Sequence, residues 1–431
     1  MQAAVTRPRP RRAPISARNA RLLLRISAVA VTAMAAWSFL LAPLLGHFTG
    51  HFEDFSVYVA AARDMAAGRS PYTSFNGNVS VVMAGFDYPP FAAVLVRPLA
   101  LLSDSGALAL WLWLSFACTV AGAVVVARTA LPASWPRTDI ALLAALAFAP
   151  ATYNYWHGQM NPVIFLLLAL AFRAWVQDRE LSCGVLLGLA AGIKLSPIVL
   201  VVLLLRRRWW RGAAAMALTA VASVAVAVPL IGAAGVRSFF DAVLPALSRD
   251  TGWIYNQSLG GLISRATDHS VLRIGATSSP LHLAVLAAGV AVLALAAWRV
   301  RAGRRDGAER GVEFGLGVVA MLLCASIAWY PHFTHLLIPI AAAAGLAARR
   351  GWRPERRLVR ALAACLVVFG LLVPLALDNL DMRTLSSIAG TPAWWPFLQL
   401  FSLPALAAVA LFAAMHAALG RERRPTVPAR A

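Results

Sequence analysis

Residues 26–45, ISAVAVTAMAAWSFLLAPLL, are 20 successive residues without a charge. A helix rises ~1.5 Å per residue, so this stretch reaches roughly 30 Å, the thickness of the hydrocarbon core of a bilayer. The first 25 residues hold seven arginines and no acid, and no small-residue cleavage pattern follows Leu45. A secretory signal peptide would show such a pattern. We therefore expect a retained first membrane helix whose amino end lies in the cytoplasm.

The rest of the chain has the composition of a membrane protein. Of its 431 residues, 60% are hydrophobic and 13% are charged, a balance that a water-soluble domain does not tolerate without aggregating. We predict an all-α integral membrane protein, a polytopic bundle of about 12 membrane helices (roughly 10 to 13) with amphipathic helices in its outer loops. The apolar stretches behind this count lie near residues 26–45, 88–102, 107–127, 140–155, 162–177, 181–205, 213–234, 281–298, 314–330, 333–347, 358–377 and 393–418.

Three of these stretches are poor as simple membrane crossings. Residues 140–155 and 162–177 are short for a full span, and residues 181–205 contain Gly192 and Pro197. A re-entrant or broken helix is tolerated in a membrane only where protein or a water-filled cavity covers the exposed backbone. We therefore expect some of these segments to be broken.

Arginine clusters account for the positive charge of the chain. A net charge of +21 is typical of nucleic-acid binding, but here the arginines concentrate in short connections between apolar stretches. Alternate threading of the stretches places these connections on the side of the amino terminus, as the excess of basic residues in cytoplasmic loops requires. Binding of nucleic acid is therefore not expected. The clusters lie at residues 206–211, 299–310, 349–360 and 421–424.

The threading divides the chain into basic cytoplasmic tails at residues 1–25 and 419–431 and a membrane domain at residues 26–418. We expect a multi-pass plasma-membrane protein with both termini in the cytoplasm and a working surface on the outer face, where the long loops 46–87 and 235–280 lie. The sequence lacks the glycine-rich phosphate-binding motifs of ATPases and dinucleotide-binding enzymes. Its four cysteines lie in apolar stretches, so neither a disulfide, a metal nor another cofactor is expected.

A carboxylate follows the first membrane helix. Residues 51–63, HFEDFSVYVAAAR, have the spacing of an amphipathic helix at the membrane surface, with Asp54 and Tyr58 beside its apolar stripe. Glu53 and Asp54 either stabilise the amino end of this helix through its dipole, or Asp54 is a general base that takes a proton from a hydroxyl group. The predicted stripe comprises Phe52, Phe55, Val59, Ala62 and Ala66.

Lys194 is the only lysine of the chain and lies within an apolar stretch, in residues 191–197, AGIKLSP. A helix break between Gly192 and Pro197 would let its ammonium group face an internal cavity, where it would pair with an anion such as a lipid phosphate. The alternative is a lysine that extends along the helix to the membrane interface.

Three polar segments lie between apolar stretches, where apolar residues would cost less free energy in a membrane. They are residues 157–161 (HGQMN), residues 255–261 (YNQSLGG) with Arg265 nearby, and residues 329–335 (WYPHFTH). Amide groups bind sugar hydroxyls or exposed helix ends, and the composition does not decide between these roles. The candidate amides are Gln159, Asn161, Asn256 and Gln257.

The two histidines of the third segment, His332 and His335, have no acidic or cysteine neighbours, so contact with a phosphate is a better prediction than a metal site. The aromatic residues beside them fit an interfacial belt. In residues 86–91, FDYPPF, the prolines mark the start of a helix, and local structure explains most of that segment.

Six short motifs together resemble glycosyltransferase family 87, the polytopic GT-C-fold enzymes of actinobacteria that include mannosyltransferases of phosphatidylinositol mannoside and lipomannan synthesis. The resemblance covers roughly residues 20–345, with the motifs in the family's order. They are Asp54–Tyr58 (DFSVY), Tyr88–Phe91 (YPPF), Gly158–Asn161 (GQMN), Gly192–Pro197 (GIKLSP), Asn256–Ser258 (NQS) and Trp329–His332 (WYPH).

The resemblance implies inverting transfer of a sugar, most often mannose, from a polyprenyl-phosphate donor to a lipid-linked or glycan acceptor on the outer face of the bilayer. Asp54 matches the aspartate that acts as general base, and His332 falls in the motif near the donor phosphate. The family commonly has paired histidines there, whereas this chain has Pro331 before His332 and a second histidine at His335. Either histidine is therefore a candidate for the phosphate contact.

The chemistry of such a transfer fits the residues. A base must take the acceptor proton, and a leaving phosphate needs cations or hydrogen-bond donors. We assign Asp54 to the first role, Lys194, His332, His335 and Arg265 to the second, and Tyr58, Tyr88, Gln159, Asn161, Asn256 and Gln257 to substrate binding. An arabinofuranosyl or other polyprenyl-phosphate sugar transferase, and a transporter or flippase of lipid-linked sugars, are the alternatives.

Overall fold

The computed structural model describes residues 16–46, 52–72, 85–249, 251–267, 279–301, 305–377 and 401–420. Every element in these ranges is a helix, so the expected all-α architecture is confirmed. Within the described residues, six helical segments are long and apolar enough to cross a membrane. They are Arg18–Leu41, Asp104–Ala130, Trp210–Leu247, Pro280–Arg299, Tyr330–Arg350 and Leu403–Gly420.

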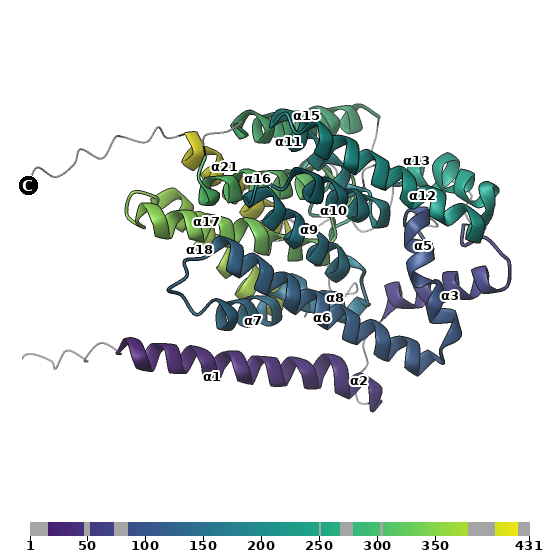
Figure 1. The fold of residues 1–431 in the computed structure, drawn as a ribbon, viewed down its shortest axis with the longest axis horizontal. Coiled ribbons are helices and arrows are strands. Elements are labelled where there is room, and N and C mark those ends of the chain that lie inside the picture. The colour runs from purple at the N-terminus through teal and green to yellow at the C-terminus, as the bar shows by residue number, and fades with distance from the viewer. Residues whose placement is uncertain are drawn as a thin grey trace, which may run out of the picture.

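The amino-terminal part runs from one long helix into a layer of further helices, one of which is longer still (Figure 1). Its elements are α1 (Ala17–Ala36), η1 (Trp37–Leu41), α2 (Ala42–Leu44), α3 (Glu53–Ala66), α5 (Pro90–Val96), η2 (Arg97–Leu101), α6 (Asp104–Ala130), α7 (Arg137–Ala147), α8 (Ala149–His157), α9 (Asn161–Val176), α10 (Glu180–Ile193), η3 (Ser196–Leu200) and α11 (Val201–Arg206).

The carboxyl-terminal part packs against this layer. Its elements are α12 (Trp210–Ser238), η4 (Phe239–Val243), α13 (Leu244–Leu247), α14 (Leu259–Thr267), α15 (Ser279–Arg299), α16 (Gly307–Cys324), η5 (Tyr330–Leu336), α17 (Leu337–Arg350), α18 (Arg356–Val367), η6 (Val368–Leu377) and α21 (Leu403–Gly420). Of the predicted outer loops, residues 47–51, 73–84, 250 and 268–278 lie outside the described residues.

Two of the doubtful membrane stretches are broken, as expected. Residues 140–155 are divided between α7 and α8 at Phe148, and Pro150 follows in the first turn of α8. Residues 181–205 are interrupted at Lys194, whose backbone is extended with φ −147° and ψ 131°. Because a residue with extended backbone cannot continue the helical ladder, α10 ends here and the Lys194 side chain leaves the line of the helix. The second break borders the cavity described below.

Close packing of α10 against α12 fixes the position of this break. A Cβ atom on Gly184 would lie 2.0 Å from the carbonyl oxygen of Gly212, and one on Gly192 would lie 2.7 Å from the Ser223 hydroxyl. Small residues at such contacts let two helix backbones approach closely, which is the common way helices associate in membranes. The carboxyl end of α10 is therefore held firmly, with Lys194 directly after it.

Helix α3 buries a different stripe from the predicted one. The helix itself is confirmed, but Tyr58 is 0% exposed and Ala66 is exposed. The prediction placed Tyr58 beside the apolar stripe and Ala66 within it, because it assumed a helix that contacts only the membrane surface. In the folded chain α3 packs on α5 and η2, and this contact rotates the buried face toward Tyr58.

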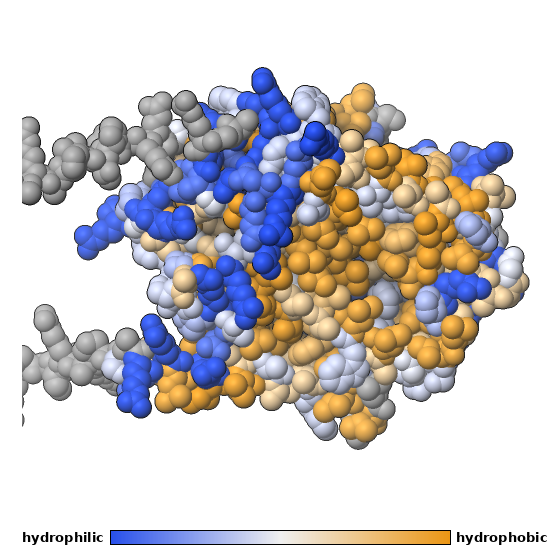
Figure 2. Space-filling model, in the orientation of Figure 1, coloured by the Kyte–Doolittle hydropathy of each residue, from blue (hydrophilic) through white to orange (hydrophobic). Residues whose placement is uncertain are grey.

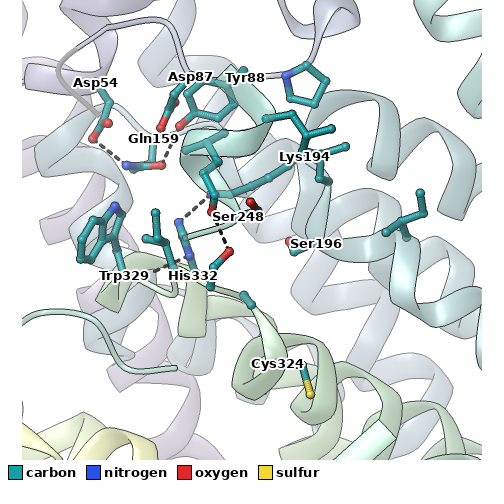
Figure 3. A pocket seen from close by; sticks show the side chains of 18 residues that line it. Asp54, Asp87, Tyr88, Gln159, Lys194, Ser196, Ser248, Cys324, Trp329 and His332 are labelled. Carbon is teal, nitrogen blue, oxygen red and sulfur yellow. Dashed lines mark hydrogen bonds between the residues drawn. The ribbon is translucent and has the colours of Figure 1, made fainter. Parts of the chain in front are cut away.

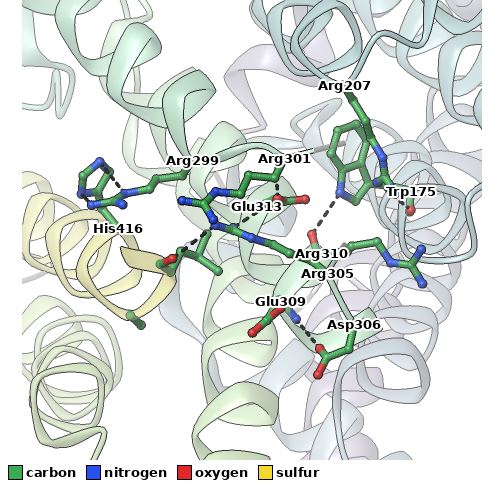
Figure 4. Close-up of polar contacts among 12 residues, drawn as sticks. Trp175, Arg207, Arg299, Arg301, Arg305, Asp306, Glu309, Arg310, Glu313 and His416 are labelled. Atoms are coloured by element: carbon green, nitrogen blue, oxygen red, sulfur yellow. Dashed lines mark hydrogen bonds and ion pairs between the residues drawn. The ribbon is translucent and has the colours of Figure 1, made fainter. Parts of the chain in front are cut away.

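Charged residues gather at the end of the molecule remote from α3 and α5. Figure 2 shows the hydrophilic residues mainly at the left of the view, with a broad hydrophobic surface over the rest. Figure 4 shows residues from two of the predicted arginine clusters meeting there. Asp178 pairs with both Arg207 and Arg310, while Arg350, from a third cluster, pairs with Glu309 at 2.7 Å.

Within this charged network, Glu313 is the most deeply buried acid. Its side chain is 0% exposed and lies 3.1 Å from the guanidinium of Arg305, which is itself 7% exposed. Removing one partner of a buried ion pair leaves the other charge uncompensated, which typically costs about 3 to 5 kcal/mol. We expect Glu313→Gln to lower the free energy of unfolding by about that amount, measured by titration with a denaturing detergent. The control Asp64→Asn, in the exposed pair with Arg69, should cost at most about 1 kcal/mol.

Candidate functional site

A cavity of about 450 Å³ opens where α3, the chain before α5, the break after α10, and the segment between α16 and η5 meet. In Figure 3, Asp54 and Trp329 lie at one side of it, Ser196 and Cys324 at the other, and Lys194 and His332 between them. Its polar lining residues are Asp54, Asp87, Tyr88, Gln159, Lys194, Ser196, Ser248, Ser326, Trp329 and His332. Its other lining residues are Pro89, Leu195, Ile198, Leu244, Leu247, Cys324, Ala325 and Ile327.

The position of Asp54 depends on a junction between the start of α3 and the end of α8. The backbone N–H of Phe52 donates to the carbonyl oxygen of Trp156 at 3.1 Å. Gly158, with φ 68°, ends α8 in the left-handed conformation and lies directly against Phe55. Its carbonyl oxygen accepts a hydrogen bond from the indole of Trp111 at 2.7 Å. We call this contact the α3–α8 junction.

From this junction, a chain of hydrogen bonds runs into the cavity. Gln159 Nε2 donates to Asp54 Oδ2 at 2.6 Å. The Gln159 Oε1 atom accepts from Tyr88 and from Asn161, each at 3.3 Å. The Tyr58 hydroxyl donates to the Tyr88 hydroxyl at 2.7 Å. Tyr58 and Asn161 therefore support the lining residues from behind.

The same chain of hydrogen bonds continues to Lys194 and His332 at the centre of the cavity. Lys194 Nζ donates to Asn161 Oδ1 at 3.0 Å and lies 2.6 Å from His332 Nε2. The Nδ1 atom of His332 accepts from the backbone N–H of Trp329 at 3.1 Å. The Lys194 Nζ atom is also 5.7 Å from the centre of the Tyr88 ring, a distance at which a charged lysine makes a cation–π contact. Lys194 thus faces a cavity, as the functional interpretation of this residue predicted.

Asp87 also lines the cavity, although it was not among the predicted site residues. Burial raises the pKa of Asp87 to about 7, with Lys194 lowering it and Asp54 raising it further. Burial also raises the pKa of Asp54, against which His157, the hydrogen bond from Gln159, and Lys194 act. Asp87 was overlooked because the prolines that follow it explained its segment as a helix start. The available signal was the aspartate itself, because an acidic residue is rare in so apolar a chain.

Six predicted site residues do not line the cavity, among them Tyr58 and Asn161, which lie behind it. His335 lies behind it, 2% exposed and stacked on Phe165 with ring centres 6.3 Å apart. Arg265 is fully buried, and its guanidinium donates to the carbonyl oxygen of Asn256 at 2.6 Å and to the Ser402 hydroxyl at 2.9 Å. A direct contact of either residue with a donor in this cavity would need the site to rearrange.

Asn256 and Gln257 are the other two, and both shape the wall of the cavity. Asn256 Nδ2 donates to the carbonyl oxygen of Ser326 at 2.9 Å, and its Oδ1 accepts from the N–H of Ala328 at 2.9 Å. The backbone N–H of Gln257 donates to the carbonyl oxygen of Ala328 at 2.8 Å. Because Ser326, Ile327 and Trp329 line the cavity, the hydrogen bonds of Asn256 and Gln257 hold the backbone that forms this part of its wall.

The arrangement offers a carboxylate, a pair of nitrogen donors and an apolar wall within one cavity. Among the described residues, no group of three or more His, Cys, Asp or Glu side chains is placed to hold a metal ion. The cavity can accordingly hold an amphipathic ligand with an anionic group near Lys194, while Asp54 is available to accept a proton.

Comparison with known proteins agrees with this chemistry. The chain is 31% identical over 345 residues to the polyprenol-phosphate-mannose-dependent alpha-(1-2)-phosphatidylinositol pentamannoside mannosyltransferase of Mycolicibacterium smegmatis, covering 78% of each chain. It is 29% identical to the protein of the same name from Mycobacterium tuberculosis, over 74% of this chain and 72% of that one. It is 28% identical to the alpha-(1-2)-phosphatidylinositol mannoside mannosyltransferase of M. smegmatis with the same donor dependence, over 80% and 81%. The family model of glycosyltransferase family 87 matches residues 86–326, more than half of the chain, and this chain belongs to that family.

Proposed function

We propose that this glycosyltransferase moves mannose from polyprenyl-phosphate mannose to a lipid-linked mannoside or glycan, with inversion and with Asp54 as general base. The observation that carries the proposal is the placement of Asp54 and of the Lys194–His332 pair in one cavity with an apolar wall. The names of the relatives support the donor and the class of acceptor. No separate nucleotide-binding part is needed, because the sugar is already activated by its lipid phosphate.

The proposed donor position follows from the polarity of the cavity. The polyprenyl chain lies along the wall that includes Leu244 and Leu247, and the phosphate lies at Lys194 and His332. The sugar then points toward Asp54, and the acceptor hydroxyl approaches from the side of Asp54 and Trp329. A hydrogen-bond donor aimed at the phosphate stabilises the charge that develops as the bond to the sugar breaks.

The reaction step is a single displacement. Asp54 takes the proton of the acceptor hydroxyl, whose oxygen forms a bond to the anomeric carbon. The bond between that carbon and the phosphate oxygen breaks, and its electron pair stays on the phosphate. Attack from the face opposite the phosphate inverts the configuration of the carbon.

The proposed orientation places this cavity on the outer face of the plasma membrane, in a GT-C-type bundle of about 12 spans with both termini in the cytoplasm. The arginine clusters support it, because basic connections favour the cytoplasmic side. These clusters meet around Asp178 and Glu309, whereas α3 and α5 lie at the other end in Figure 1. The outer face is also where a lipid-linked sugar and a mannolipid acceptor meet.

The proposal is tested by product analysis. Purified protein in liposomes is given radiolabelled polyprenyl-phosphate mannose or polyprenyl-phosphate arabinose, together with phosphatidylinositol mannosides. We expect a labelled mannolipid of inverted configuration at the new bond. A product from the arabinose donor alone would change the assigned sugar. If intact labelled donor exchanged between the two leaflets and no product formed, the protein would be a transporter and not a transferase.

The raised pKa of Asp54 predicts a pH dependence. A general base must be ionised, so kcat/KM should fall about tenfold per pH unit below the pKa of Asp54. Because burial raises this pKa, the fall should begin at a higher pH than the ordinary aspartate value of about 3.9 would give. Gln159→Leu removes the hydrogen bond that lowers the pKa, so it should move the acidic limb of the pH–rate profile to higher pH. An acidic limb that stays in place in this variant would contradict the assignment.

A further inference from the structure

Lys194 and His332 cannot both have their ordinary protonation in this geometry. Their nitrogen atoms Nζ and Nε2 are 2.6 Å apart, so one hydrogen must lie between them and the other nitrogen must accept it. His332 Nδ1 accepts from the backbone N–H of Trp329, which always carries its hydrogen. A neutral imidazole has a single N–H, which must therefore be on Nε2.

The Lys194 side of the contact is fixed by its other partner. Asn161 Nδ2 donates to Asn154 Oδ1 at 2.9 Å, so Asn161 Oδ1 is left to face Lys194 as an acceptor at 3.0 Å. Asn154 is itself oriented, since its Nδ2 donates to the carbonyl oxygen of Pro150 and to the hydroxyl of Thr334, each at 2.7 Å. Lys194 therefore donates to Asn161 and must accept from His332. An ammonium group has three donors and no acceptor.

We propose that Lys194 is a neutral amine before the donor binds, hydrogen-bonded by the Nε2–H of His332, and that binding of the donor's phosphate diester is coupled to the uptake of one proton by Lys194. This inference rests on the proposed function only in taking the anion to be a phosphate diester. A phosphate oxygen that breaks this 2.6 Å contact and moves the two nitrogens apart would accept a hydrogen bond from each of them. The amine is then free to take a proton from solvent, and it becomes an ammonium that stabilises the anion.

The other titratable groups near Lys194 do not replace it as the acceptor of the hydrogen on His332 Nε2. Asp54 and Asp87 line the same cavity from α3 and from the chain before α5, and His335 lies behind His332 on η5. Both carboxylates favour a charged lysine, but neither replaces His332 as the partner at 2.6 Å. A neutral lysine at rest also avoids burying a cation in the cavity before the phosphate arrives.

A single lysine makes the protonation of this group directly observable. Protein labelled with ζ-¹⁵N lysine and carrying a lysine-free tag gives a resonance from Lys194 alone. At pH 8 we expect the shift of a neutral amine in the empty protein and of an ammonium after addition of mannosyl farnesyl phosphate, a short-chain donor. His332→Gln offers a carbonyl acceptor in place of the Nε2–H, so its empty form should show an ammonium. An ammonium signal in the empty wild type, or a neutral amine in both proteins, would overturn the inference.

Proton uptake is measured independently by calorimetry. Mannosyl farnesyl phosphate is a diester whose own charge does not change in this pH range. The heat of binding is measured in buffers of different ionisation enthalpy, and its dependence on that enthalpy gives the number of protons that the protein takes up. Between pH 8 and 9.5, above the Asp87 pKa of about 7, we expect close to one proton per ligand and affinity falling up to about tenfold per pH unit. The Lys194→Arg variant, whose side chain stays charged, should bind the ligand without proton uptake and with an affinity that does not fall over this pH range.

These outcomes separate the inference from the proposed function. Equal proton uptake in wild type and Lys194→Arg would refute the proton coupling even if mannose transfer is confirmed. Proton-coupled binding of the diester by a protein that transfers no mannose would keep the inference and refute the proposed function. A wild type that binds the diester with no proton uptake, while the NMR resonance is unchanged, would also refute the inference.

Discussion

Asp54→Asn is expected to lower kcat for mannose transfer by about 10² to 10⁴, the range that a positioned general base contributes. Asparagine keeps the size of the side chain and can still contact Gln159, but it cannot take the proton of the acceptor hydroxyl. Donor affinity should remain within a few-fold of wild type, since the donor phosphate is proposed to lie at Lys194 and His332. The measurement is single-turnover transfer together with equilibrium binding of the short-chain donor.

The matched control for this substitution lies on the same helix. Asp64 pairs with Arg69 on the surface at 2.6 Å and does not line the cavity, so Asp64→Asn should leave kcat unchanged. If Asp54→Asn and Asp64→Asn transfer mannose equally well, the general-base assignment is wrong. If Asp54→Asn loses donor binding as well as turnover, Asp54 holds the donor instead of activating the acceptor.

The predictions that held are those in which a residue conflicted with its surroundings in the sequence. Lys194 is a single cation within an apolar stretch, and burial of a charge is costly enough that a cavity was a sound expectation. The breaks in residues 140–155 and 181–205 were likewise visible, because a short span and a proline have local physical consequences. Asp54 could be named for its place after the first span, although its role stays a prediction.

The parts that sequence did not reveal depend on which helices meet. Tyr58 is buried because α3 packs on α5 and η2, a contact without a periodic signature in α3 itself. Arg265 was expected at a phosphate, but the folded chain uses it to bind backbone carbonyls and Ser402, which lies 137 residues away in the sequence. Asp87 faces the cavity through a short segment whose prolines already had a local explanation. Such tertiary contacts override local pattern, which is the usual limit of reading one sequence.

Gly158→Ala is expected to lower kcat/KM for mannose transfer by about 100-fold, the effect of displacing a catalytic group by ~1 Å. Gly158 has φ 68°, which costs an alanine roughly 1 to 2 kcal/mol. In addition, a Cβ atom there would lie 2.5 Å from the Cβ of Phe55, so α3 and α8 must separate. Asp54 precedes Phe55 directly and is held by Gln159, the residue after Gly158, so the α3–α8 junction cannot open without moving the base.

A glycine at the other end of α3 separates the effect of the collision with Phe55 from the effect of backbone strain. Gly68 has φ 73°, and a Cβ atom added there would have no other atom within 4 Å, so Gly68→Ala carries the same strain without the collision. Both variants should lose stability in detergent titrations, whereas Gly158→Ala alone should lose transfer. Its affinity for the short-chain donor should persist, because Lys194 and His332 lie on other elements. Equal activity of the two variants would mean that the α3–α8 junction does not position Asp54, and that Gln159 alone sets the direction of its carboxylate.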